Sequence, residues 1–126
     1  MADIVKGLVI AGLGEGRKLG YPTANLKLTP DSFRPTPGVY LATVKGLGKS
    51  SLYGLLISGV HQEASKEPRV EVYVIDWQTD IYGQNLIVEV GDKIRDLVFT
   101  NDATELKKLI EQDIIAGRQY FKGNIL

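Results

Sequence analysis

The chain has 126 residues, enough for one domain with its own core, so we expect residues 1–126 to fold as a single domain. Its 15 basic and 15 acidic residues balance, and this zero net charge gives no general attraction to nucleic acid or to an acidic membrane. Without cysteine and with one histidine, the chain cannot form disulfides, use thiolate catalysis or bind metal through cysteines or several histidines.

The first half of the chain is predicted to contain three strands. Residues 4–11, 38–44 and 52–58 are rich in Val, Ile, Leu and Tyr, a composition typical of strands. A turn is expected over 46–51. The segment 12–37 is expected to be long and irregular, and loops of that length in compact domains are usually functional or disordered.

The second half begins with a predicted hairpin. Residues 70–75 alternate, with three valines on one face and Glu71 on the other, which predicts a half-buried strand. A turn over 80–85 and a strand over 86–90 complete the hairpin.

A helix is predicted at the end of the chain. Apolar residues recur at helical spacing over 106–114, in a stripe that also includes Asp113, and 102–105 fits a capping box. We expect Gly117 to weaken or end this helix. Short strands joined by turns, without βαβ alternation, indicate an antiparallel barrel or sandwich with the helix packed on one side or end.

The segment from Gly12 to Asn25 carries the strongest functional signal. Glycines permit tight turns and close approach to a ligand, and nearby cations and backbone N–H groups suit an anion. Thr23 and Asn25 add neutral oxygens of the kind that Mg²⁺ accepts. The spacing fits neither a Walker loop nor a Rossmann turn. The segment therefore predicts a site for a metal-bound phosphate chain, with a mobile surface loop as the alternative.

The same residues resemble a known family. Gly-x-Gly-x-Gly-Arg-Lys-Leu-Gly-Tyr-Pro-Thr-Ala-Asn-Leu, followed by Pro-Gly-Val-Tyr, closely resembles the riboflavin kinase (flavokinase) family. The resemblance extends in the same order over about residues 7–118, and the supporting segments are 70–76, 80–83 and 94–96 with Phe99. It implies an all-β dominated fold, a six-stranded antiparallel Greek-key barrel with a C-terminal α-helix.

The resemblance also implies an activity. The family transfers the γ-phosphoryl group of ATP, its co-substrate, to the 5′-hydroxyl of riboflavin, giving FMN and ADP, with Mg²⁺ or another divalent cation. By motif position, Glu71 would be the general base, and Thr23 and Asn25 would hold the metal. The nucleotide-binding residues implied are Gly12, Gly14, Gly16, Lys18, Gly20, Thr23 and Tyr82, and those on the flavin side are Arg95 and Phe99.

Each of three side chains also has a purely structural interpretation. Glu71 could be a solvent-exposed acid on an amphipathic strand. Arg95 could be a surface arginine paired with Asp92 or Asp96. Tyr82 could be a turn aromatic that packs on the barrel.

Two segments depart from the family pattern. The stretch 57–68 lacks the Asn of an Asn-x-Gly motif and a later Pro-Thr pair, and the step from Arg95 to Phe99 is one residue short. This departure motivates an alternative function, a catalytically impaired flavin- or nucleotide-binding module on the same barrel.

Cellular context is predicted from what the sequence lacks. No apolar run is long enough to span a bilayer, and residues 1–6 carry an acid where a signal peptide would be basic. We expect a cytoplasmic monomer with no nucleic-acid or membrane partner. No nucleotidyltransferase domain accompanies the kinase-like segment, so a stand-alone kinase or a part of a larger protein is expected.

Overall fold

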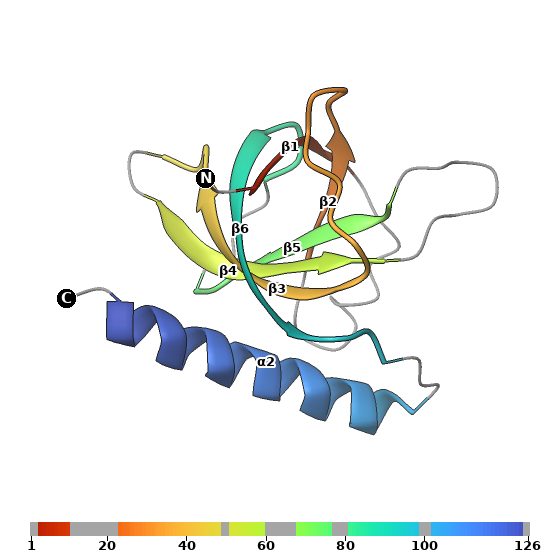
Figure 1. Ribbon diagram of the computed structural model, residues 1–126, viewed down its shortest axis with the longest axis vertical. Coiled ribbons are helices and arrows are strands. Elements are labelled where there is room, and N and C mark those ends of the chain that lie inside the picture. Colours follow the sequence, from red (N-terminus) through yellow and green to blue (C-terminus); the bar gives the residue numbers. More distant parts are fainter. Residues whose placement is uncertain are drawn as a thin grey trace.

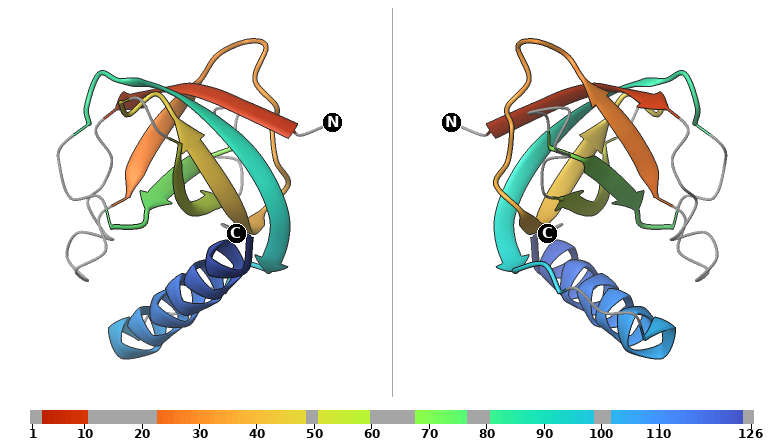
Figure 2. Two further views of the ribbon diagram at one scale, coloured as in Figure 1. Left: turned by 90° about the vertical axis from the view of Figure 1, so that its left-hand side faces the viewer. Right: turned by 90° about the vertical axis from the view of Figure 1, so that its right-hand side faces the viewer.

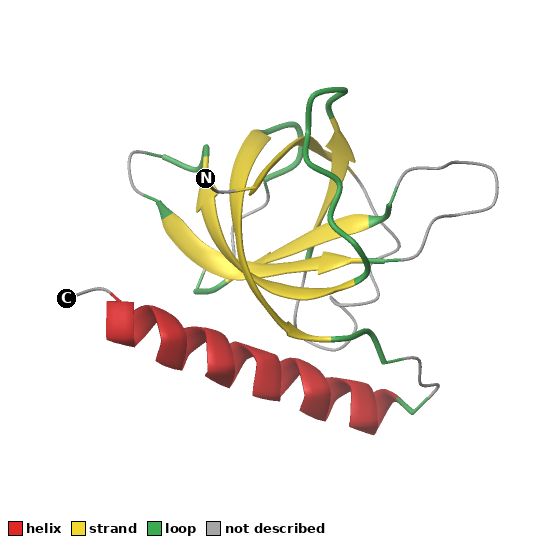
Figure 3. Cartoon of the chain, viewed as in Figure 1, coloured by secondary structure: helices red, strands yellow, loops and turns green. Residues whose placement is uncertain are grey.

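The chain forms a closed antiparallel barrel followed by a long helix (Figure 1). The computed structural model describes residues 3–10, 23–48, 51–59, 68–76, 81–98 and 102–124. The strands are β1 (Asp3–Ile10), β2 (Ala24–Leu28), β3 (Gly38–Lys45), β4 (Leu52–Ser58), β5 (Val70–Val74) and β6 (Asn85–Arg95), and the helix is α2 (Ala103–Asn124). They close in the order β1-β2-β5-β4-β3-β6, which confirms the predicted barrel with a C-terminal helix (Figure 3).

Strand alternation produces two separate apolar clusters. One face of every strand points into the barrel, where the buried side chains are mostly Val and Leu. The outward residues of β3 and β4 form a second cluster with α2, and this cluster includes Val39, Leu41, Leu55, Ile114 and Phe121. Figure 2 shows α2 lying along the outside of the barrel, with β1 on the opposite side.

The prediction that 12–37 is irregular throughout was wrong, because it contains β2. Ala24 and Leu26 point inward on this strand, which pairs with β1 and β5. The alternation extends over only five residues and is flanked by prolines, so its sequence signal was weak. Residues 11–22 lie outside the described part of the chain.

The predicted hairpin between 70–75 and 86–90 was also wrong. The strands are present, but β5 pairs with β2 on one side and β4 on the other, so it has no edge left for β6. Instead β6 pairs with β1 and β3, and closes the barrel.

The residues between β2 and β3 are held against β1. The Lys6 backbone N–H donates to the Ser32 hydroxyl at 2.9 Å. The Arg34 guanidinium donates to the carbonyls of Thr29 at 3.2 Å and Ser32 at 2.7 Å. This part of the segment is irregular in backbone conformation yet fixed by hydrogen bonds.

Helix α2 begins where the capping pattern predicted. Asp102 Oδ1 accepts hydrogen bonds from the backbone N–H groups of Thr104 and Glu105, as expected of an N-cap. The prediction that Gly117 ends the helix was wrong, because α2 continues to Asn124, whereas the alternative that Gly117 weakens the helix stays a prediction. Gly117 instead lets the helix approach the barrel: a Cβ there would lie 3.3 Å from Ile75 Cδ1. In the described part of the chain, no helix has the length and apolarity needed to cross a membrane.

Candidate active site

One lateral row of outward-facing residues crosses five strands of the barrel. Strand register places Asn25 opposite Glu71, Glu71 opposite Ile57, Ile57 opposite Val39, and Val39 opposite Arg95. Directly opposed residues have Cβ atoms about 5 Å apart and share a face of the sheet. The row therefore connects the predicted metal residue, the predicted base and the predicted flavin-side arginine on the outside of the barrel.

The polar end of the row is formed by Thr23, Asn25 and Glu71. The Thr23 hydroxyl donates to Glu71 Oε1 at 3.3 Å, and all three side chains are partly buried. This end therefore places a hydroxyl, an amide and a carboxylate oxygen close together, where they could serve as metal ligands. Such a donor set fits Mg²⁺, which binds oxygen ligands and keeps several waters.

The Glu71 side chain points outward from β5 because side chains alternate along a strand. Val70 and Val72 are each 1% exposed inside the barrel, so the intervening Glu71 must point outward. The interpretation of Glu71 as merely a solvent-exposed acid does not fit, because its side chain is partly buried and bonded to Thr23.

The other end of the row is tied to the helix. Arg95 donates from Nε and Nη2 to the two carboxylate oxygens of Asp113 at 2.8 and 2.7 Å. Its Nη1 donates to the backbone carbonyl of Asp96 at 3.0 Å. The alternative that placed Arg95 in a surface pair with Asp92 or Asp96 named the wrong carboxylate, since the partner is on α2.

Tyr82 lies in a turn between β5 and β6, and its side chain is 51% exposed. The turn is held to the end of β1, because Gly83 N–H donates to the Val9 carbonyl and Val9 N–H to the Gln84 carbonyl. Since Ile10 pairs with Asn25, this turn is near the polar end of the row. The remaining predicted site residues, Gly12, Gly14, Gly16, Lys18, Gly20 and Phe99, lie outside the described residues.

Comparison with known proteins identifies the family. Residues 3–121 match the riboflavin kinase family. The chain belongs to the riboflavin kinase family. This membership agrees with the resemblance found in the glycine-rich segment and accounts for the barrel with its C-terminal helix.

The curated relatives of this family member are larger proteins. A bifunctional riboflavin kinase/FMN adenylyltransferase from Buchnera aphidicola subsp. Acyrthosiphon pisum (strain APS) is 36% identical over 120 residues. The match covers 93% of this chain and 38% of that relative. The chain therefore spans little more than a third of the relative's length.

Two solved structures share the fold. A structure described as a macrolide-efflux protein from Streptococcus pneumoniae has a TM-score of 0.85 at 30% identity, over 93% of this chain and 38% of that one. Riboflavin kinase from Trypanosoma brucei has a TM-score of 0.66 at 23% identity, over 94% of this chain and 79% of that one. The second likeness bears on the fold alone.

The sequence did not reveal the site roles of two residues, Asp113 as the partner of Arg95 and Ile57 as the neighbour of Glu71. Asp113 was seen as part of the helix stripe, and a carboxylate among apolar positions was the signal that it needs a buried partner. Ile57 stands opposite Glu71, but only the barrel register could place it there.

Proposed function

We propose that the chain is an ATP:riboflavin 5′-phosphotransferase of the riboflavin kinase family, and that residues 1–126 form one such domain. The observation that carries the proposal is the cluster of Thr23, Asn25 and Glu71, in which two motifs far apart in sequence meet on one face of the barrel. A carboxylate beside neutral oxygen donors supplies the two functions that transfer to an alcohol needs, a proton acceptor and a place for a metal-bound phosphate.

In the proposed reaction, Glu71 accepts the proton of the ribityl 5′-hydroxyl. The hydroxyl oxygen then forms a bond to the γ-phosphorus, the bond from that phosphorus to the β–γ bridging oxygen breaks, and ADP leaves with FMN as the other product. Thr23 and Asn25 would hold a divalent cation, which when bound neutralises charge on the phosphates. The glycine-rich segment with Lys18 and the turn at Tyr82 are proposed to bind the nucleotide, and Arg95 and Phe99 to belong to the flavin side.

A second candidate function is a flavin- or nucleotide-binding module with impaired turnover. It is favoured by Ile57, an apolar residue directly opposite Glu71 where the family pattern has a polar asparagine. An apolar neighbour removes one hydrogen-bonding group from beside the proposed base.

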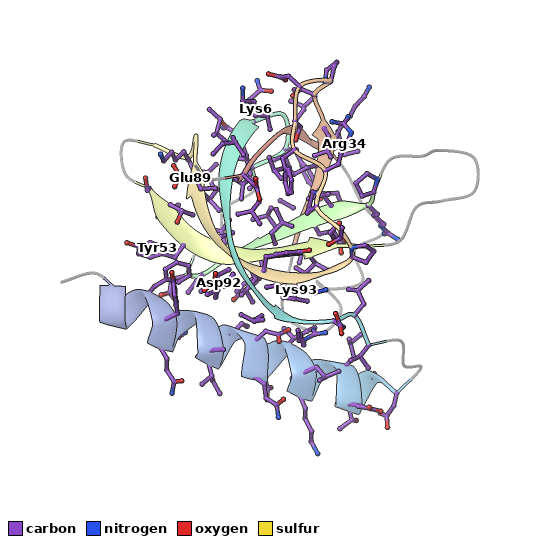
Figure 4. The ribbon with its side chains drawn as sticks, in the orientation of Figure 1. Lys6, Arg34, Tyr53, Glu89, Asp92 and Lys93 are labelled. Atoms are coloured by element: carbon purple, nitrogen blue, oxygen red, sulfur yellow. The ribbon has the colours of Figure 1, made fainter. Side chains whose placement is uncertain are left out.

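The test is FMN formation from riboflavin, ATP and Mg²⁺, followed by chromatography, for wild type and Glu71→Gln. Loss of a general base lowers kcat by roughly 10²–10⁴-fold. We expect a loss in that range, with affinity for a non-hydrolysable ATP analogue unchanged. The matched control is Glu89→Gln. Glu89, labelled in Figure 4, is another strand carboxylate on the barrel surface, and it forms an ion pair with Lys45.

Three outcomes separate the two functions. FMN formation that Glu71→Gln abolishes supports the kinase. Riboflavin fluorescence quenched on mixing, with no FMN from wild type, supports the binding module. FMN formation that Glu71→Gln leaves unchanged removes Glu71 as the base.

The metal ligands have a separate test. We expect Thr23→Ala to raise the KM for Mg-ATP more than the KM for riboflavin, and the reverse result would contradict the metal assignment. The preferred metal, a cytoplasmic location, a monomeric state and the absence of nucleic-acid partners stay predictions.

A further inference from the structure

Among the residues that the structure describes, two arginine–aspartate pairs tie α2 to the barrel, and they differ in burial. Arg95 and Asp113 have side chains 23% and 9% exposed. Arg118 and Asp76 form an equally bidentate pair, at 2.9 and 2.7 Å, but their side chains are 49% and 71% exposed. The first pair joins the end of β6 to the middle of the helix, and the second joins the end of β5 to a later turn.

Stability alone does not explain the buried pair. Removing a carboxylate from water is costly, and a well-packed apolar residue usually stabilises a protein at least as well as a buried ion pair does. Asp113 is nonetheless on the apolar side of α2, next to Ile114, which is 8% exposed in the outer cluster. An acid at this position requires a reason connected with its partner.

The partner is an arginine that also holds the backbone. With Nε and Nη2 fixed by Asp113, the planar guanidinium directs Nη1 to the carbonyl of Asp96 at 3.0 Å. Ile94 and Leu97 on either side pack into the outer cluster with Ile110 and Ile114. The segment that leaves β6 is thus set by one ion pair to α2 and by two apolar side chains packed against the outer cluster.

We propose that Asp113 is a positioning residue for the flavin side of the site. Asp113 orients the Arg95 side chain, and Arg95 in turn fixes the backbone at Asp96, where the chain leaves β6. This rests on the proposed riboflavin kinase function. Arg95 shares the lateral row with Glu71, so a shift at Asp96 displaces the bound acceptor relative to the base. Helix α2 then contributes to the acceptor site through Asp113, in addition to packing against the outside of the barrel.

The variant Asp113→Asn separates this role from direct flavin binding by Arg95. It keeps the size of the side chain and removes its charge, which frees the guanidinium. If Arg95 bound riboflavin directly, a freed guanidinium would keep or strengthen binding. If Arg95 acts through the backbone at Asp96, the same variant weakens binding.

We expect Asp113→Asn to raise the KM for riboflavin about tenfold, which is roughly 1.4 kcal/mol of lost binding. The KM for ATP should change less than about twofold, because sites that share no contacts influence each other by no more than about 0.5 kcal/mol. Asp113→Glu, which keeps the charge, should restore part of the loss. The matched control is Asp76→Asn, which breaks the exposed pair on the same helix and should change neither KM. Asparagine is suitable there because Asp76 has φ 63°, a conformation that asparagine tolerates.

A second variant and a second measurement keep the proposal testable if Asp113→Asn folds poorly. Arg95→Lys leaves a cation for Asp113 but lacks the fork that reaches Asp96, so the KM for riboflavin should again rise. Amide hydrogen exchange at Leu97 and Val98, measured without substrate, should be faster in Asp113→Asn and Arg95→Lys than in wild type and Asp76→Asn.

The outcomes distinguish the two proposals. Unchanged exchange at Leu97 and Val98, or a lower melting temperature with both KM values unchanged, overturns the positioning role. Riboflavin affinity that rises in Asp113→Asn also overturns it and makes Arg95 a direct ligand. Faster amide exchange in the variants, with no FMN formed by wild type, would contradict the kinase function but would support the fixing of the Asp96 backbone by Asp113 and Arg95.

Discussion

The barrel interior and the outer face beneath α2 are built from similar residues but do different work. The interior is lined almost entirely by aliphatic side chains, with Leu56, Leu86 and Val88 at 0–1% exposure. The outer face adds to its aliphatic residues the stacked rings of Tyr53, which Figure 4 labels, and Phe121, with ring centroids 4.1 Å apart. The outward positions of the strands also carry the row from Asn25 to Arg95, of which Val39 and Ile57 belong to the outer cluster. The interior thus supplies a rigid scaffold, and the outward positions that it fixes carry the chemistry.

The strongest way to break this division is to truncate adjacent leucines of β4 that face opposite sides. Leu56 lies inside the barrel at 0% exposure, and Leu55 lies beneath α2 at 3%. Leu56→Ala leaves a cavity that closed strands cannot collapse into, so we expect a loss of about 2–5 kcal/mol in the free energy of unfolding, measured by urea denaturation.

Leu55→Ala is expected to cost less, because α2 can settle into part of the space. It should also raise the KM for riboflavin, whereas Leu56→Ala should leave the KM of the folded fraction unchanged. Equal changes in KM for the two variants would show that the faces are not functionally distinct. Leu8→Ala, at a position 36% exposed on β1, is the control and should change stability by less than about 0.5 kcal/mol.

The contact between helix and barrel can be opened at Gly117. A leucine there must displace Ile75 and Leu55, whose side-chain atoms lie 3.3 and 3.5 Å from the position of a Cβ. We expect Gly117→Leu to lose about 1–3 kcal/mol of stability in thermal or urea unfolding, the usual cost of overpacking.

Gly117→Ala is the matched variant. Its single methyl group is tight against the far end of the Ile75 side chain and at ordinary contact distance from Leu55, and alanine gains about 1 kcal/mol of helix propensity over glycine. We expect a change in stability near zero. A loss as large as that of Gly117→Leu would mean that the contact has no room even for a methyl group.

A smaller effect is expected from Ser58, a polar residue that points inward. It is 0% exposed, and its hydroxyl donates to the Pro35 carbonyl at 2.8 Å, linking β4 to the residues before β3. Ser58→Ala should cost about 1 kcal/mol in urea denaturation, the typical net value of one hydrogen bond. Ser51→Ala, at an exposed position, is the control, and an equal loss in both would contradict the role of the Pro35 bond.

Local patterns in the sequence predicted the elements well and their partners poorly. The alternation around Glu71 and the cap at Asp102 each depend on a few neighbouring residues, and both were confirmed. The hairpin of β5 with β6 failed because pairing in a barrel is decided by which edges remain free, a property of all six strands.

In the candidate site too, local motifs predicted which residues take part but not which residues contact each other. The resemblance named Thr23, Asn25, Glu71 and Arg95 from short motifs, but it could not reveal the single row that joins the last three. Asp113 was noticed within the helix stripe, yet its partner lies 18 residues earlier in the chain, beyond any local pattern. Gly117 looked like a helix end because helix-breaking propensity is local, whereas its close packing against Ile75 is tertiary.

The smallest expected effect belongs to the exposed pair of Arg118 and Asp76. Hydrogen bonds from Arg118 hold the pKa of the Asp76 carboxyl below its usual value of 3.8, outweighing the opposing effect of desolvation. A carboxyl with a lowered pKa in the folded state stabilises the fold above its unfolded pKa, and this contribution disappears as the pH falls through the lowered value. We therefore expect wild type to melt slightly above Asp76→Asn at neutral pH, and the difference to shrink as the pH falls below 3.8 and to vanish once the pH is below the lowered pKa of Asp76. Because both side chains are exposed, high salt should reduce the difference as well. A difference in melting temperature that persists unchanged into strong acid would assign it to the left-handed backbone at Asp76 rather than to its charge.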